Sequence, residues 1–80
     1  MSKIHVIWER EISEALVTAP VGSKWMHTRR GGIYTIVGLT IIESTWELGV
    51  VYGDKRRFPL SITRAASEFF DGRFVRQGDH

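Results

Sequence analysis

The fold is decided by residues 24–43, KWMHTRRGGIYTIVGLTIIE. The pattern of 24–28 predicts a first strand, and the two glycines that end the segment 29–32 supply the positive φ angles of a tight turn. Residues 33–43 are rich in β-branched side chains, so we expect a second strand there rather than a helix. Because this strand is apolar on both faces, we expect it to cross the middle of a small curled sheet, with Gly38 marking a bulge.

Three further strands are predicted after this hairpin. Apolar side chains recur at every second position over 46–52, which predicts a third strand. A hairpin turn at 53–56 leads into a fourth alternating segment over 58–62. A short helical turn over 64–70 is then expected before a last strand over 73–76.

The N-terminal segment, residues 1–20, is predicted to form an amphipathic helix. Trp8, Ile12 and Leu16 recur every four positions and would form an apolar stripe on one face. An alternative interpretation makes 3–8 a short strand, because apolar and polar residues alternate there.

Together these elements predict a mostly β (α+β) domain. Residues 21–76 would form a five-stranded SH3-like small barrel, with a short helical turn before the last strand. The N-terminal helix over 1–20 would pack on the outside of the barrel or across one open end, and 77–80 would form a frayed tail. The core is expected to contain Trp25, Ile36, Leu39, Val50 and Phe70.

The composition is that of one small globular domain. The chain has 80 residues, a hydrophobic share of 42% and a formal net charge of +2, so intrinsic disorder is not expected. The absence of cysteine excludes a disulfide framework and thiolate metal sites. The longest apolar run, 33–42, is far shorter than the roughly 20 residues of a membrane span, and the N-terminus shows no signal-peptide pattern. We therefore expect a cytoplasmic protein without a membrane partner.

The three histidines, His5, His27 and His80, do not stand at a spacing typical of a catalytic or metal-binding site. A nucleophile, a base and an orienting group must lie in hydrogen-bond contact, and no such set is recognisable. A metal site needs three or four ligands, and the chain has no glycine-rich phosphate loop. The sequence therefore predicts a protein that is not an enzyme and holds no cofactor.

Basic residues are concentrated in the predicted turns. In an antiparallel sheet, the turns at 29–32 and 53–56 can converge on one rim, within reach of aromatic side chains. Basic groups that hold phosphates and aromatic rings that stack on bases are typical of single-strand and RNA binding. The alternative is that the charged turns are solvated and the aromatic rings fill the core. The candidate binding residues are Arg29, Arg30, Tyr34, Trp46, Tyr52, Lys55, Arg56, Arg57 and Arg64.

Four short motifs follow one another along the predicted barrel. They are Gly-x-x-Trp-x-His at 22–27, Gly-Gly-x-Tyr at 31–34, Val-Val-Tyr at 50–52 and Phe-x-x-Arg-Phe at 70–74. In these motifs residues 21–76 resemble a group of small uncharacterised bacteriophage and prophage proteins with an SH3-like barrel. That group usually has aromatic-x-Arg-Pro before the final helical turn, where this chain has Ile-Thr-Arg-Ala at 62–65. A ligand surface built on that aromatic residue would be altered here.

The resemblance implies an accessory protein of a phage or mobile element. We expect a non-enzymatic protein that binds and obstructs a host protein or nucleoprotein complex, such as a defence complex of the CRISPR kind. The alternative is a small β-barrel that binds RNA or DNA directly through the basic turns. The acidic helix face at Glu9, Glu11 and Glu14 is a second candidate contact.

Overall fold

A five-stranded antiparallel sheet preceded by a helix forms the part of the chain that the structure describes. The structure is a computed structural model that covers residues 2–78, with side chains from residue 9 onward. In chain order the elements are α1 (Ser2–Thr18), β1 (Lys24–His27), β2 (Ile33–Ile42), β3 (Glu47–Gly53), η1 (Lys55–Arg57), β4 (Ile62–Ala65), α2 (Ala66–Glu68), η2 (Phe69–Arg73) and β5 (Phe74–Arg76).

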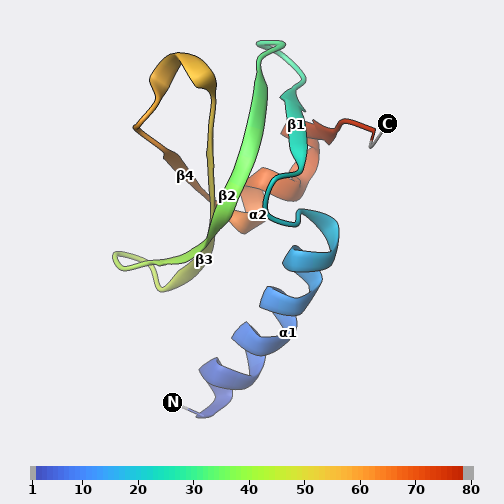
Figure 1. Cartoon of the computed structure of the whole chain (residues 1–80). Coiled ribbons are helices and arrows are strands. Elements are labelled where there is room, and N and C mark those ends of the chain that lie inside the picture. Colours follow the sequence, from blue (N-terminus) through green and yellow to red (C-terminus); the bar gives the residue numbers. More distant parts are fainter. Residues whose placement is uncertain (1, 79–80) are drawn as a thin grey trace.

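The strands are arranged in the order β4-β3-β2-β1-β5. Strands β1 to β4 form a meander in which each pairs with the next, and β5 returns to pair with β1. The outer strands β4 and β5 are joined through α2 and η2, which lie against the curled sheet (Figure 1). This topology confirms the predicted mostly β domain, with its five-stranded SH3-like arrangement, N-terminal helix and helical turn before the last strand.

The meander places the two basic turns at the same end of the sheet. Because neighbouring strands are antiparallel, the β1–β2 and β3–β4 connections lie at one end and the β2–β3 connection lies at the other. Figure 1 shows the first two connections together at the top of the molecule. We call the end formed by residues 28–32 and 54–61 the basic end.

The long strand β2 contains the predicted irregularity. Its register against β3 shifts between Ile36 and Gly38, which confirms a bulge beside the glycine. Before the bulge, Tyr34 and Ile36 are buried while Ile33 and Val37 are exposed. The extra residue changes which face the following side chains take, so the strand bends across the middle of the sheet.

The core is an aromatic cluster between the sheet and the α2–η2 segment. The rings of Phe69 and Phe74 stack with centroids 4.3 Å apart, and Trp25 meets Phe69 edge-on at 5.2 Å. Of the predicted core residues, Trp25, Ile36 and Val50 are buried and Leu39 is partly buried against them. The prediction for Phe70 is wrong, because its side chain is 36% exposed and Phe69 is the fully buried neighbour. Successive side chains on a helical turn point about 100° apart, so only one of the pair can face the sheet.

The fourth strand lies further along the chain than the predicted 58–62. Asp54 accepts a hydrogen bond from the backbone N–H of Arg57 at 3.0 Å, which caps η1. The backbone N–H of Leu60 donates to the Arg57 carbonyl at 2.7 Å, and Pro59 has no N–H to pair. These local bonds keep the chain turning, so β4 begins only at Ile62.

Helix α1 covers most of the predicted 1–20 segment and packs through part of the predicted stripe, because Ile12 is partly buried against the core. The alternative short strand over 3–8 is wrong, because those residues lie within α1. Ala15 and Ala19 are buried, whereas Leu16 is 44% exposed. The side chain of Trp8 lies outside the described residues. The helix therefore docks through Ile12 and Ala15 on its C-terminal half and projects away from the sheet toward its N-terminus (Figure 1).

The C-terminal tail is held one residue further than predicted. Gln77, placed in the frayed segment 77–80, donates its backbone N–H to the Lys24 carbonyl at 2.8 Å. This bond continues the β1–β5 pairing by one step beyond Arg76. Residues 79 and 80 lie outside the described part of the chain.

The burial difference between two neighbouring phenylalanines predicts their effects on stability. Phe69→Ala removes a fully buried ring and should lower the free energy of unfolding by about 3–5 kcal/mol. A domain of this size has only roughly 3–5 kcal/mol in total, so the variant should be largely unfolded. Phe70→Ala is the matched control and should melt cooperatively, because its ring is partly exposed. Thermal melts followed by circular dichroism would contradict this packing if both variants had the same midpoint.

Candidate anion-binding site

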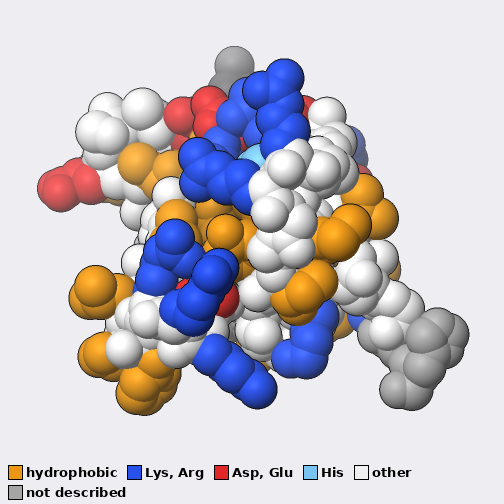
Figure 2. Space-filling model, turned by 90° about the horizontal axis from the view of Figure 1, so that it is seen from above, with side chains coloured by type: hydrophobic (Ala, Val, Ile, Leu, Met, Phe, Trp, Pro, Cys, Tyr) orange, Lys and Arg blue, Asp and Glu red, His pale blue; other side chains and the backbone are white. Residues whose placement is uncertain are grey.

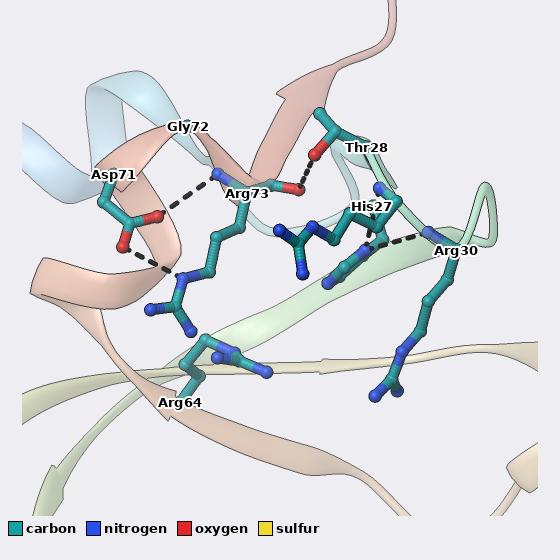
Figure 3. A pocket seen from close by; sticks show the side chains of 8 residues that line it. His27, Thr28, Arg30, Arg64, Asp71, Gly72 and Arg73 are labelled. Carbon is teal, nitrogen blue, oxygen red and sulfur yellow. Dashed lines mark hydrogen bonds and ion pairs between the residues drawn. The ribbon is translucent and has the colours of Figure 1, made fainter.

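A cleft of about 630 Å³ opens at the basic end between three segments that are far apart in the sequence. One wall is formed by β1 and its following turn, another by the Arg64 side chain from β4, and the third by η2 (Figure 3). Figure 3 shows the side chains of Arg30, Arg64 and Arg73 arranged around the ring of His27. The lining residues are His27, Thr28, Arg29, Arg30, Arg64, Asp71, Gly72 and Arg73.

The pairing of β1 with β5 holds two of these walls together. His27 is the register partner of Phe74, and the backbone N–H of Thr28 donates to the Arg73 carbonyl at 2.8 Å. The Thr28 hydroxyl donates to the same carbonyl at 3.2 Å. Gly72 has a φ of 105°, a left-handed conformation that favours glycine. It turns the chain from η2 into β5, so that Arg73 reaches the edge of the cleft.

Two of the lining side chains, His27 and Arg64, rest on the ring of Phe74, which is buried. The His27 ring meets it edge-on with centroids 5.0 Å apart. The Arg64 guanidinium lies over the same ring at 5.8 Å from its centroid, within the range of a cation–π interaction. Arg64 also donates from Nε to the Tyr52 hydroxyl at 3.4 Å. This hydrogen bond is the main factor that raises the pKa of Arg64 above its usual value, and nearby Glu68 and Asp71 act in the same direction.

Carboxylates neutralise only part of the positive charge around the cleft. Asp71 accepts from Nε of Arg73 at 3.0 Å, and Glu68 lies 3.5 Å from Arg64 and 3.9 Å from Arg73. Within the part of the chain that the structure describes, Arg29 and Arg30 have no carboxylate within ion-pair distance. Four guanidinium groups against two carboxylates therefore leave an excess of two positive charges.

His27 is held in one tautomer by backbone donors. Its Nδ1 accepts from the N–H of Arg29 at 3.3 Å and from that of Arg30 at 3.1 Å. The neutral ring must therefore carry its proton on Nε2, where it can donate. Partial burial lowers the pKa of His27 from 6.5, and the positive charges of Arg30, Arg64, Arg29 and Arg73 lower it further. At neutral pH His27 is thus an uncharged donor among four cations.

The structure brings together three of the arginines that the sequence singled out: Arg29, Arg30 and Arg64. Sequence analysis missed Arg73 and Asp71 as site residues and dismissed His27. The signal that could have found them is the return of the last strand to β1 in an SH3-like order, which sets Phe74 opposite His27. With that pairing, the residue before Phe74 must lie beside the β1–β2 turn.

The second basic turn, Lys55–Arg57, lies at the same end but outside the cleft lining. Asp54 forms ion pairs with Arg57 and, at 3.8 Å, with Arg56. Figure 2, viewed onto this end, shows several groups of blue Lys and Arg side chains gathered on it. The predicted convergence of both basic turns on one rim therefore matches the arrangement of the chain.

The predicted aromatic partners of the basic residues are not at that rim. Tyr34 and Tyr52 are buried and meet each other edge-on at 5.3 Å, so neither ring can stack on a base. Trp46 is exposed but lies on the β2–β3 connection, at the opposite end of the sheet. The alternative that the tyrosines fill the core is the one that the structure supports.

The cleft has the chemistry of an anion-binding site. Thr28 provides the only hydroxyl among its lining residues, and this hydroxyl donates to a backbone carbonyl. Among the described residues no group of three or more histidine or acidic side chains is placed to hold a metal ion. Apart from the Asp71 carboxylate, which is paired with Arg73, the lining offers positive charge and N–H donors, and these bind anions.

No family model, curated protein or solved structure matches this chain in the comparisons. Across the described residues, no helix combines the length and apolar character that crossing a bilayer requires.

The position of His27 among four arginines predicts a pH effect on stability. Its pKa lies below 6.5 in the folded protein, so the unfolded chain takes up the proton first as the pH falls. The contribution of His27 to the free energy of unfolding should be complete above pH 6.5. It should decline as the pH falls from there toward the pKa of His27 in the folded protein. An NMR titration should show this low pKa directly, and Arg30→Ala should raise it.

His27→Asn is the matched control for the pH effect. The asparagine carbonyl can accept the same two backbone N–H bonds without titrating. Chemical unfolding should be measured at several pH values. In this variant the free energy of unfolding should no longer show the decline that His27 causes at low pH, while any contribution of His5 and His80 remains. Identical pH profiles for the wild-type and variant proteins would contradict the lowered pKa.

Proposed function

We propose that this protein is a non-enzymatic accessory protein of a bacteriophage or mobile element, acting in the host cytoplasm. It binds a host protein or nucleoprotein complex through the basic end and obstructs it, a defence complex of the CRISPR kind being one such target. The phage origin rests on the resemblance of the sequence motifs. The observation that carries the binding role is the concentration of incompletely neutralised arginines at one end of the barrel.

Exposed apolar side chains beside these arginines favour a protein surface as part of the target. Phe58 is 83% exposed and Leu60 is 72% exposed, and both follow Lys55–Arg57 directly. Large apolar or aromatic side chains next to arginine are the composition of interface hot spots. Burial of these two side chains against a partner would add a hydrophobic contribution to the charge contacts.

Direct binding to RNA or DNA is the second candidate. It is favoured by Arg29 and Arg30, which are exposed and have no carboxylate partner within the described residues. The burial of Tyr34 and Tyr52 removes these two rings as stacking platforms. Contacts at this end would therefore be made to phosphates, which hold the backbone without reading the bases.

Charge reversal tests whether the basic end is the contact surface. Arg29→Glu with Arg30→Glu, or Arg56→Glu with Arg57→Glu, should abolish capture of the partner from a bacterial lysate, because like charges would then face the target. Glu9→Lys with Glu11→Lys, on the exposed face of α1, is the control and should retain capture. Capture that survives both folded basic-end variants, or is lost only in the helix variant, would overturn the assignment.

Salt dependence separates the two candidate functions. If phosphates are the target, the affinity for a labelled single strand should fall with a log–log slope of about −0.7 per phosphate neutralised. Arg30→Ala should flatten that slope by about one phosphate contact. Fluorescence titrations at two salt concentrations measure both quantities. Binding weaker than about 10⁻⁴ M at low salt would reject direct nucleic-acid binding, since non-specific binders normally exceed it.

A further inference from the structure

We propose that the His27 cleft binds a phosphomonoester group in its dianionic form. This inference rests on the proposed function, because it takes the basic end as the contact surface, and it names the chemical group that the cleft recognises. The phosphoryl group is common to nucleotides and to phosphorylated side chains, and the test below distinguishes these two carriers.

The first argument is the convergence of donors from three elements. Arg29 and Arg30 come from the β1–β2 turn, Arg64 from β4 and Arg73 from η2, and all four line one cleft. Guanidinium groups present paired N–H donors that match phosphate oxygens. A compact group with three oxygens can accept from several walls at once, which a planar carboxylate with two oxygens cannot do to the same extent.

The second argument is the charge. The four arginines with Asp71 and Glu68 leave an excess of two positive charges at the cleft. A phosphomonoester carries about −1.5 to −2 at pH 7, which balances this excess. A backbone phosphodiester or a carboxylate carries a single negative charge and would leave the cleft positive.

The third argument is that the carboxylate in the cleft is directed away from the wall formed by the turn. Asp71 accepts from the backbone N–H of Arg73 at 3.2 Å and from its Nε at 3.0 Å, both within the same segment (Figure 3). It therefore neutralises Arg73 and leaves Arg29 and Arg30 for an external anion.

His27 provides a neutral donor at the centre of this arrangement. Its Nδ1 is occupied by two backbone donors, so the Nε2–H is the group that can bind an anion. The charged groups that face the ring are Arg29, Arg30, Arg64 and Arg73, with Asp71 on the opposite wall. A bound dianion would offset these cations and favour the imidazolium form, so ligand binding should raise the pKa of His27.

The test is an NMR titration of the full ¹⁵N-labelled chain at about pH 7.5, where a phosphomonoester is a dianion. The probes are inorganic phosphate, a nucleoside 5′-monophosphate and O-phosphoserine, with a 3′,5′-cyclic nucleotide as the diester, all in about 0.15 M salt to screen distant charges. The monoesters should perturb His27 and residues 28–30 and 71–73, and should bind at least about tenfold more tightly than the diester. The tighter of the two organic monoesters identifies the natural carrier.

Matched arginine variants separate the cleft from general charge attraction. Arg30→Ala, on an exposed turn, should weaken monoester binding about tenfold through the loss of a charged hydrogen bond. Arg10→Ala removes the same charge from the exposed face of α1 and should change binding less than about twofold. The pKa of His27 should rise with saturating monoester in the wild-type protein.

Four results would overturn the proposal: no binding of a monoester, equal binding of monoester and diester, perturbations confined to 54–61, or equal losses in the Arg30 and Arg10 variants. Its failure is distinguishable from failure of the proposed function. If the charge-reversal variants lose capture of the partner while no monoester binds, the basic end is a contact surface without a phosphate site. If monoesters bind but both reversal variants retain capture, the cleft is a ligand site and the obstructing surface lies elsewhere.

Discussion

The ring of Phe74 is the point on which both the fold and the cleft depend. It stacks on Phe69 at the centre of the aromatic core, with centroids 4.3 Å apart. It also contacts the ring of His27 edge-on, and the guanidinium of Arg64 lies over it. Its backbone pairs with β1, which brings the last strand back to the first. A single residue therefore completes the sheet, fills the core and supports two of the side chains that line the cleft.

The residues that line the cleft therefore fall into two groups. Some are held by the core packing that stabilises the fold, and others lie on a turn that does not contribute to this packing. His27 and Arg64 lie on buried rings, and Arg64 also donates to the buried Tyr52, so their positions follow from core packing. Arg29 and Arg30 lie on an exposed turn and contribute charge without supporting the core. Substitutions of Arg29 and Arg30 would therefore change the charge of the cleft at little cost to the fold. The buried Phe74 ring meanwhile holds His27 and Arg64 in place, and such pre-organisation would lower the entropic cost of binding an anion.

The parts of the fold that follow local patterns were predictable, and those that depend on competition between local bonds were not. β-Branched residues revealed β2, alternating side chains revealed β3, and Gly38 marked the bulge. The fourth strand was misplaced because the cap from Asp54 to Arg57 prolongs the turn past residue 58, although the side chains there still alternate. Phe70 was placed in the core, where Phe69 lies, because sequence periodicity does not give the rotation of a short helical turn about its axis.

By itself, the sequence determined a β-rich meander with a helical start, and it determined that the two basic turns share one end. Both follow from local periodicity and from the alternation of direction in an antiparallel sheet. Only the tertiary structure decided that Arg64 and Arg73 join Arg29 and Arg30 around His27, and that Tyr34 and Tyr52 are buried beneath them. The physical reason is that the cleft depends on the pairing of β1 with β5. That contact joins residues nearly fifty positions apart, and it is stabilised by packing of the whole aromatic core rather than by any pattern along the chain.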